Sequence, residues 1–457
     1  MMRSGVCRLL PALLLVSGAA FAEIGTIDDV PAATLLVPYF ECQLNSSLVP
    51  VTPGMNTLFS INNASATAVL AHVTMWTDES IPSLDFDVYL TGYDVQTISV
   101  CDIFKGNLPI TASVGQDPKD TISPKGSLSQ DINFASCTTR LPYTNPAVNA
   151  TLLAHIRNLH TGHASATYGG NCGGFNFGDT IARGYITVDT TTQCSLDFPS
   201  TPSYWSGVAS YQNVLWGDYF YVNDAENFAQ GETSVHIEAC TPGNGYIGYV
   251  GTGTSGVNTC PFAAGDYTFY GRYVSGLGTD QREALATQFA SRYINGGAFT
   301  GGTDLLVWRD SGTPPDTRLG SLGFSCASGA SWFPLNQADV VAFDEQEHPA
   351  DLCFQGDNIS PPTGGADTCF PLEAQRISLQ GGNIAGADPT PPFTFGWMFL
   401  NLNTTVAGGF FNPTKQAWVT TEMDASGRFS VGYDAIKLDG ANQTFQSASP
   451  GGRLLIP

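Results

Sequence analysis

Short runs in which apolar and polar residues alternate are the feature that most restricts the fold of this chain. In residues 69–76 every second side chain is apolar, and the same alternation recurs in residues 85–90. A repeat of two residues is typical of a β-strand that buries one face. The chain also contains 50 glycines and 28 prolines, which divide it too often for long helices. We therefore expect a mainly β protein of antiparallel sheets with a few short helices.

Further segments with strand-like composition extend along the whole chain. Five of the expected strands fall within 80 residues near the N-terminus, a spacing that suggests an immunoglobulin-like sandwich. The other segments are residues 33–40, 57–61, 95–100, 181–188, 214–222, 234–239, 267–273, 305–308, 395–400, 417–421 and 428–436. Residues 424–427 (Asp-Ala-Ser-Gly) suit a hairpin turn between the last two.

Two domains are expected after the first 22 residues. Residues 23–145 would form the immunoglobulin-like β-sandwich, and residues 146–457 a second β-rich domain with two short helices. The boundary is placed at the turn-forming residues 143–146. One alternative stays open, in which later strands return to complete the first sandwich.

Two segments have helical spacing. The first follows Asn149, a good N-cap, and its apolar residues recur every three or four positions up to Leu159, before Gly162. The second begins at Asp280 with a capping box completed by Glu283. Its apolar side chains would share one helical face: Leu285, Phe289 and Tyr293.

The first 22 residues have the features of a signal peptide. Two arginines precede the apolar run of residues 9–16, and Ala20 and Ala22 place small side chains before a cleavage point at Glu23. No later stretch approaches the roughly 20 apolar residues of a membrane-spanning helix. We therefore expect a secreted protein, periplasmic or extracellular, without membrane insertion.

The mature chain keeps ten cysteines, and an even number in an exported chain indicates disulfide bonds. No CxxC motif occurs, which disfavours zinc and thioredoxin-like sites. Many connectivities are compatible with ten cysteines, and we favour the shortest loops. The expected bonds are Cys101–Cys137, Cys172–Cys194, Cys240–Cys260 and Cys353–Cys369, with Cys42–Cys326 by elimination.

Six segments resemble an uncharacterised family of secreted bacterial proteins of the Gram-negative type. They are residues 33–40 (ATLLVPYF), 84–93 (LDFDVYLTGY), 182–188 (ARGYITV), 215–221 (LWGDYFY), 268–273 (TFYGRY) and 342–347 (AFDEQE). The resemblance spans most of the mature chain and implies a bacterial exported protein. It implies no activity, so no functional residue is carried over.

Charge restricts the partners of this chain. It has 18 Lys and Arg against 40 Asp and Glu, a formal net charge of −22. Such a surface repels phosphate groups, which argues against nucleic acid and anionic membranes as partners. A cell-surface or glycan partner remains compatible with it.

The densest group of oxygen ligands lies in residues 344–351. Its members are Asp344, Glu345, Glu347, His348 and Asp351. A hard cation such as calcium would suit these ligands, although the glycine and asparagine positions of calcium loops are missing. A solvated acidic loop is the simpler interpretation. We expect no cofactor, and calcium is the one candidate.

Asp85 and Asp87 form a second pair of carboxylates, on one face of an expected strand. Such a pair could act as acid and base or bind a cation. The solvated face of a half-exposed strand is the simpler interpretation. His72 and His236 also lie in expected strands, where hydrogen bonds across the sheet would hold them.

Other chemistry-bearing residues have structural interpretations. We expect capping and surface roles for the histidines of the first helix region, His155, His160 and His163. We expect ion pairing or aromatic stacking for Arg183, Arg272, Arg292 and Arg309, rather than a clamp on an anionic ligand. Most rings of residues 216–221 and 269–273 should be core rather than a sugar-stacking platform. The GxGxxG motif of residues 251–256 is expected to be a loop.

These patterns favour a non-enzymatic function. The chain contains no GxSxG and no HExxH motif, and no catalytic residue is assigned. We expect a secreted structural or adhesive protein. A carbohydrate or small-ligand binding protein is the alternative, ahead of an extracellular hydrolase.

Overall fold

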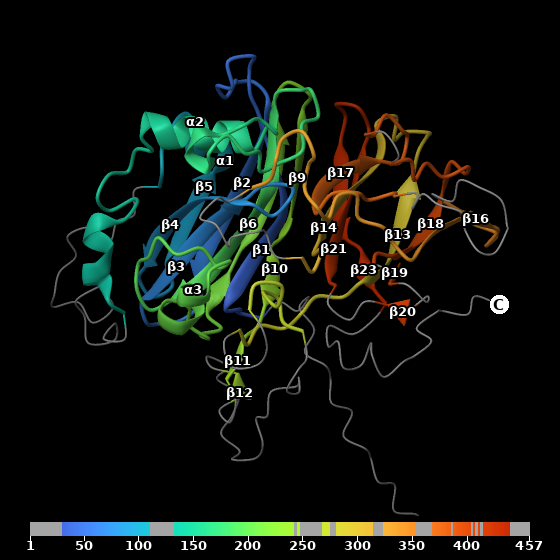
Figure 1. Cartoon of the computed structure of the whole chain (residues 1–457). Helices are drawn as coiled ribbons and strands as arrows, with labels where there is room; N and C mark the ends of the chain where they lie inside the picture. Colours follow the sequence, from blue (N-terminus) through green and yellow to red (C-terminus); the bar gives the residue numbers. More distant parts are fainter. Residues whose placement is uncertain are drawn as a thin grey trace, which may run out of the picture.

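A computed structural model describes residues 30–109, 132–241, 245–246, 267–274, 280–313, 323–352, 368–384, 387–403, 405–406, 410–411 and 415–438. In these residues the protein is mainly β, with antiparallel strands in three large sheets and a few short helices (Figure 1). The expected mainly β class with antiparallel sheets and a few helices is therefore confirmed, while the immunoglobulin-like type of sandwich stays a prediction.

The first sheet has ten strands in the order β4-β3-β6-β1-β2-β8-β9, with β10 beside β1 and both β5 and β7 beside β2. Its strands are β1 (Thr34–Gln43), β2 (Met55–Asn63), β3 (Val69–Trp76), β4 (Pro82–Leu90), β5 (Val95–Ser99), β6 (Ile181–Thr191), β7 (Leu215–Trp216), β8 (Asp218–Asn223), β9 (Phe228–Thr233) and β10 (Val235–Ile237). Strands from both sides of the expected boundary near residue 145 thus belong to one sheet. This is the alternative in which later strands return to the first sandwich.

Two further sheets form the rest of the molecule. The second, in the order β17-β14-β21-β22, consists of β14 (Gly302–Arg309), β17 (Ala374–Ser378), β21 (Ala417–Asp424) and β22 (Ser430–Asp434). The third, in the order β16-β15-β18-β13-β23, consists of β13 (Gln288–Ile294), β15 (Asp339–Phe343), β16 (Pro349–Asp351), β18 (Phe395–Asn401) and β23 (Ile436–Lys437). Two small pairs are β11 (Cys240–Thr241) with β12 (Gly245–Tyr246), and β19 (Thr405–Val406) with β20 (Phe410–Phe411).

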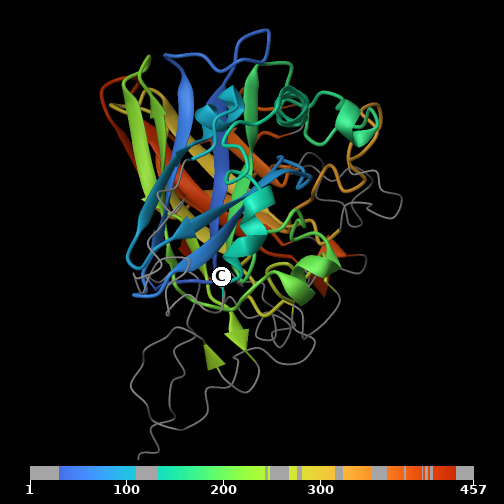
Figure 2. The same cartoon turned by 90° about the vertical axis from the view of Figure 1, so that its left-hand side faces the viewer.

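The three large sheets are stacked as layers, and the second sheet is the middle one. Figure 2 views the molecule from the side of the first sheet, with the other two behind it. On β14, Leu306 and Trp308 belong to the core shared with the first sheet, while Leu305 and Val307 belong to the core shared with the third. A strand buried on both faces needs apolar residues at successive positions. The run Leu-Leu-Val-Trp of β14 meets this need.

Short helices accompany the first sheet. They are α1 (Val100–Lys105), α2 (Ala150–Leu159), α3 (Pro202–Gly207) and the 3₁₀ segments η2 (Phe134–Thr139) and η3 (Ala166–Tyr168). The α2 prediction is confirmed, since the Asn149 side chain accepts the Leu152 N–H at 2.9 Å and Ile156 and Leu159 are buried. None of the helices in the described ranges has the length and apolarity to cross a membrane.

The second predicted helix is wrong. Residues 280–287 form no helix, and β13 begins at Gln288. Phe289 and Tyr293 are four positions apart, a spacing that places side chains on one face of a strand as well as of a helix. Both side chains point into the core between the second and third sheets.

The strand expected at residues 267–273 is also wrong. This segment forms turns, with the Gly271 N–H donating to the Thr268 carbonyl and the Tyr273 N–H to the Tyr270 carbonyl. It makes a backbone hydrogen bond to the Arg282 carbonyl through the Phe269 N–H but forms no strand ladder, and its aromatic side chains pack into the core. Phe269, for example, stacks on Trp308 at 5.3 Å between ring centroids.

Three disulfide bonds join residues far apart in the sequence: Cys42–Cys101, Cys137–Cys194 and Cys172–Cys326. Cys369 is also disulfide-bonded. The expected Cys101–Cys137, Cys172–Cys194 and Cys42–Cys326 bonds are therefore wrong, although these six cysteines are all bonded. Cys260 and Cys353 lie outside the described residues, so the expected Cys240–Cys260 and Cys353–Cys369 bonds stay predictions.

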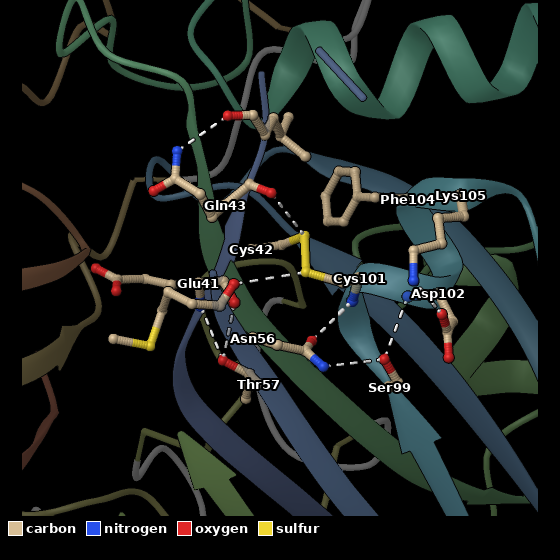
Figure 3. Close-up of a disulfide and its surroundings, with 12 residues drawn as sticks. Glu41, Cys42, Gln43, Asn56, Thr57, Ser99, Cys101, Asp102, Phe104 and Lys105 are labelled. Atoms are coloured by element: carbon tan, nitrogen blue, oxygen red, sulfur yellow. Dashed lines mark hydrogen bonds and ion pairs between the residues drawn. A yellow bond between two sulfur atoms is a disulfide. The ribbon is translucent and has the colours of Figure 1, made fainter. Parts of the chain in front are cut away.

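The failure of the short-loop rule has a structural reason, visible at Cys42–Cys101 (Figure 3). Cys42 lies in β1 and Cys101 in the first turn of α1, 59 positions apart in the sequence. Asn56 of β2 accepts the Cys101 N–H at 3.0 Å and donates to Ser99, the N-cap of α1, at 3.2 Å. Strand pairing, rather than loop length, thus brings the two sulfur atoms together.

Candidate functional site

A row of polar side chains crosses four strands of the first sheet. Thr34 on β1 lies opposite Asp189 on β6, Asp189 opposite His72 on β3, and His72 opposite Asp87 on β4. Directly opposed residues in a sheet have Cβ atoms about 5 Å apart. All four side chains are buried. The sheet therefore concentrates polar groups in one line inside the protein.

The predicted solvated face at Asp85 and Asp87 is wrong, because both side chains are buried. A covering layer lies on this face, including Tyr204 of α3 and Tyr270. The hydroxyls of these tyrosines donate to Asp189 at 2.8 and 2.9 Å. Alternation of apolar and polar residues predicts that one face of a strand is polar. It does not predict whether another layer of the protein covers that face.

His72 lies between two carboxylates. Its Nδ1 is 2.9 Å from Asp87 Oδ1, and its Nε2 is 3.9 Å from Asp85 Oδ2. Burial disfavours the imidazolium, but Asp87 and Asp85 outweigh burial and raise the pKa of His72 to about 9. Burial also raises the pKa of Asp85 to about 6. The expected hydrogen bond of His72 across the sheet is confirmed, as is that of His236, whose Nε2 accepts the Gly217 N–H at 3.3 Å.

Arg282 extends this polar row, and the sequence analysis missed it. Its Nε lies 3.4 Å from Asp189 and its Nη1 3.6 Å from Asp280. The guanidinium also lies over the Trp205 ring at 4.9 Å. Arg282 stands between acidic residues in a chain with few cations, a pattern that could have indicated a buried ion pair. The helix predicted for this segment assigned no partner to Arg282.

Ser83 and His160 form a second arrangement with chemical potential. The Ser83 hydroxyl is 2.7 Å from His160 Nε2, and His160 Nδ1 is 2.7 Å from the Arg183 carbonyl oxygen. Because a carbonyl only accepts, Nδ1 carries the proton and Nε2 accepts from Ser83. This is the hydrogen bond that activates a serine nucleophile. Both side chains are buried, however, and burial lowers the pKa of His160 to about 4.

The expected surface roles of the neighbouring histidines hold only in part. His160 is buried beside Phe40 and Phe104, so its surface role is wrong. His155 is buried as well, with its Nδ1 2.6 Å from the Ser165 hydroxyl. His163 is exposed, as expected, with its Nδ1 2.9 Å from Thr161.

The acidic residues 344–351 lie on the hairpin formed by β15 and β16, four of the candidate ligands in the turn and Asp351 in β16. Asp344 uses its own carboxylate to hold the turn, accepting the backbone N–H groups of Gln346 and His348. Its second oxygen lies 2.8 Å from His348 Nδ1, and Glu345 pairs with Arg292 at 2.7 Å. Glu347 is at the left-handed turn position, φ 66°, and Asp351 lies opposite Val341 in β16.

Across the described ranges, no group of three or more His, Cys, Asp or Glu side chains could hold a metal ion. The calcium hypothesis for Asp344, Glu345, Glu347, His348 and Asp351 stays a prediction.

The ion pairing or aromatic stacking expected of four arginines is confirmed for three of them, and Arg309 has a different structural role. Three of them form ion pairs: Arg183 with Asp179, Arg272 with Glu373 and Asp310, and Arg292 with Glu345. Arg309 instead donates to three backbone carbonyls, those of Phe370, Asn336 and Leu402. The aromatic segments are mostly core as expected, with Phe220 exposed. The GxGxxG motif lies outside the described residues.

None of the protein-family models, curated proteins or solved structures compared with this chain matches it. The functional interpretation therefore rests on the residues and their geometry.

Proposed function

We propose that this chain is a secreted, non-enzymatic protein with a structural or adhesive role. One observation carries the proposal. The side chains best suited to acid–base or nucleophilic chemistry are buried, with exposures of 0% for His72, 2% for Ser83 and 3% for His160. A catalytic group must come within about 3 Å of its substrate, whereas these groups contact other parts of the protein.

Two further features support this role. Disulfide bonds are typical of oxidising compartments outside the cytoplasm, and they agree with the signal-peptide pattern of the first 22 residues. Ion pairs with little exposure to water, such as Arg376–Glu41, connect separate sheets. The resemblance to an uncharacterised secreted bacterial family is compatible with the same role and is part of the proposal.

The test is to express the full chain with a C-terminal tag in a Gram-negative host, fractionate the cells and sequence the N-terminus of the product. We expect a protein that begins at Glu23 outside the cytoplasm and increases the retention of cells on surfaces. Retention in the cytoplasm, or no change in attachment relative to vector alone, would contradict the proposal.

A hydrolase is tested in the same preparation with a fluorophosphonate probe for activated serines. We expect no labelling of the wild type beyond that of the Ser83→Ala variant. Labelling that disappears in Ser83→Ala would replace the structural role by an enzymatic one.

A second candidate function, carbohydrate binding, is favoured by the outer face of the third sheet. Trp397 stacks on Phe343 with ring centroids 4.1 Å apart and an interplanar angle of 8°. Phe395, on the same face of β18, is 52% exposed. Arg292 lies opposite Trp397 in the sheet and pairs with Glu345. Aromatic rings beside hydrogen-bonding groups match the apolar face and hydroxyl rim of a sugar.

Binding to a panel of neutral polysaccharides tests this second candidate. We expect Phe395→Ala to weaken binding about tenfold, or roughly 1.4 kcal/mol. Phe220→Ala, which removes an exposed ring from β8, is the matched control and should bind as the wild type does. Equal loss in both variants, or no binding by the wild type, would remove this candidate.

A further inference from the structure

Arg376 of β17 lies between the first and second sheets and is shared by three carboxylates. Its Nε is 3.3 Å from Glu41 of β1, and its Nη1 is 3.1 Å from Asp304 of β14. The same Nη1 donates to Glu422 of β21. One guanidinium cannot balance three ionised carboxylates in a poorly hydrated place. An excess of negative charge remains unless one carboxyl group holds a proton.

The surroundings of the three carboxyl groups identify which one holds it. Glu41 also accepts a hydrogen bond from the Tyr39 hydroxyl at 2.8 Å, which stabilises its charge. The Asp304 side chain is 26% exposed, so water reaches it. The Glu422 side chain is 2% exposed, and its Oε1 has no hydrogen-bond partner among the described residues. Glu422 also lies directly opposite Asp304 in the sheet.

We propose that Glu422 holds a proton while the first and second sheets are in contact, so that this contact is a proton-dependent latch. The electrostatic surroundings agree with the geometry. Burial is the largest influence and raises the pKa of Glu422 to about 7 despite Arg376, with Asp304 and Glu41 acting in the same direction as burial. Burial also raises the pKa of Glu41, but Arg376, Arg183 and Tyr39 hold it below its usual range.

The neighbouring groups of β8 do not titrate between pH 4 and 8. They are Tyr219 and Tyr221, whose pKa values burial raises well above the usual range. On β22 the residue opposite Glu422 is Gly432.

Burial raises the pKa of Asp434 on β22 to about 6 and that of Glu232 on β9 to about 7. The charged groups that act on Glu422 itself are Arg376, Asp304 and Glu41, so a change at Glu422 alone separates its contribution from those of Asp434 and Glu232.

The direction of the pH effect follows from linkage. An open state returns Glu422 to water, where a glutamate has a pKa of about 4.3. The closed state thus binds more protons, and its stability falls as pH rises between about 4.3 and 7. Over this range the equilibrium constant for opening increases about tenfold per pH unit, and above it the constant levels off.

Hydrogen exchange measured by mass spectrometry from pH 5 to 8.5, corrected for intrinsic exchange rates, tests the latch. The informative amides are those of β1 and β21. Asp78 lies at the same interface with a pKa raised by burial to about 7, so the comparison between variants isolates the contribution of Glu422. Up to pH 7, each pH unit should increase the opening constant of the wild type about tenfold more than that of Glu422→Gln, because the variant lacks the proton that the wild type releases on opening.

Glu41→Gln is the matched control. Glu41 pairs with the same arginine, but its carboxylate is already ionised at pH 5. This variant should open more often at every pH and keep the wild-type slope near pH 5, but level off at a lower pH than the wild type, because Glu41 helps to raise the pKa of Glu422. Equal slopes in Glu422→Gln and the wild type would overturn the proposal.

If Glu422→Gln fails to fold, the proposal is tested in the wild type by following the carboxyl ¹³C chemical shift of Glu422 with pH. We would assign the resonance by its absence from a Glu422→Asp variant. Titration near pH 7 supports the latch, and titration below pH 5 overturns it.

Discussion

At the residue scale, the protein repeatedly places one buried cation among several carboxylates. His72 lies between Asp85 and Asp87, and Arg272 pairs with both Glu373 and Asp310. The acidic composition of the chain therefore extends into its interior. A buried charge that loses its partner is costly, so the cations should matter more to stability than their number suggests.

His72→Gln tests this view. Removal of the imidazolium leaves Asp85 and Asp87 without their cation, and we expect a loss of about 3–5 kcal/mol in the free energy of unfolding at pH 6. Because the pKa of His72 is raised to about 9 in the folded state, its contribution is fully present below about pH 6.5 and is lost as pH rises through 9. Urea denaturation between pH 6 and 10 measures both effects.

The control for this experiment is His163→Gln, which changes an exposed histidine. It should alter the free energy of unfolding by less than about 0.5 kcal/mol. A His72→Gln variant with the wild-type pH profile would show that His72 is neutral in the folded protein.

At the element scale, α2 illustrates how a local signal fixes a local structure. Asn149 caps the helix through its side chain, and Arg157 near the other end donates to the Phe104 carbonyl of α1 at 2.6 Å. The capping hydrogen bond belongs to the sequence pattern itself, so the start of α2 could be predicted.

We expect Asn149→Ala to destabilise the protein by about 1 kcal/mol and to lower its melting temperature accordingly. Asn149→Asp should restore most of the loss, because aspartate accepts the same Leu152 N–H and its charge suits a helix N-terminus. Differential scanning calorimetry compares the three proteins. A loss in Asn149→Asp as large as in Asn149→Ala would contradict the capping interpretation.

The sequence predicted most strands because alternation is a local property of the chain. In β3, for example, the apolar Val73 and Met75 alternate with His72 and Thr74, and Val73 and Met75 lie in the core. The same alternation could not show that a second layer covers the polar face at Asp87. That burial depends on residues remote in sequence, such as Ser195, whose backbone N–H donates to the Asp87 carboxylate.

The candidate sites were less predictable than the strands for the same reason. The Ser83–His160 hydrogen bond joins residues 77 positions apart, and no sequence motif predicts it. Disulfide pairing failed because Cys42 and Cys101 meet through strand order rather than through loop length. The four-residue spacing of Phe289 and Tyr293 fits both a helix and a strand. Only the packing of both side chains in the core between the second and third sheets distinguishes the two.

At the scale of the whole molecule, a middle sheet with two buried faces holds three layers together. Hydrogen bonds and ion pairs cross its interfaces, including Tyr219–Thr420 on one side and Ser291–Thr421 on the other. The Cys172–Cys326 disulfide adds a covalent link between the first half of the chain and a segment that follows β14. The stability of this arrangement should therefore depend on redox conditions.

We expect replacement of Cys172 and Cys326 by serine to cost about 5 kcal/mol on the chain-entropy model, against about 4 kcal/mol for Cys137 and Cys194. The ordering follows from sequence separations of 154 and 57 residues. Guanidinium denaturation of the two double variants gives the comparison. A larger loss for the Cys137–Cys194 pair would show that native-state strain outweighs loop entropy.

The central place of β1 in the first sheet governs the order in which the molecule can be assembled. Thr34 lies opposite Asp189 of β6 and Ile237 of β10, yet any chain that emerges N-terminus first presents β1 long before either partner. The middle layer waits longer still, because β21 begins at Ala417. Such distant pairings make folding slow, and the early strands stay available to wrong partners. A cell that makes this protein must therefore shield the first half of the chain until β10 has been made, and the face that contacts the second sheet until β21 follows.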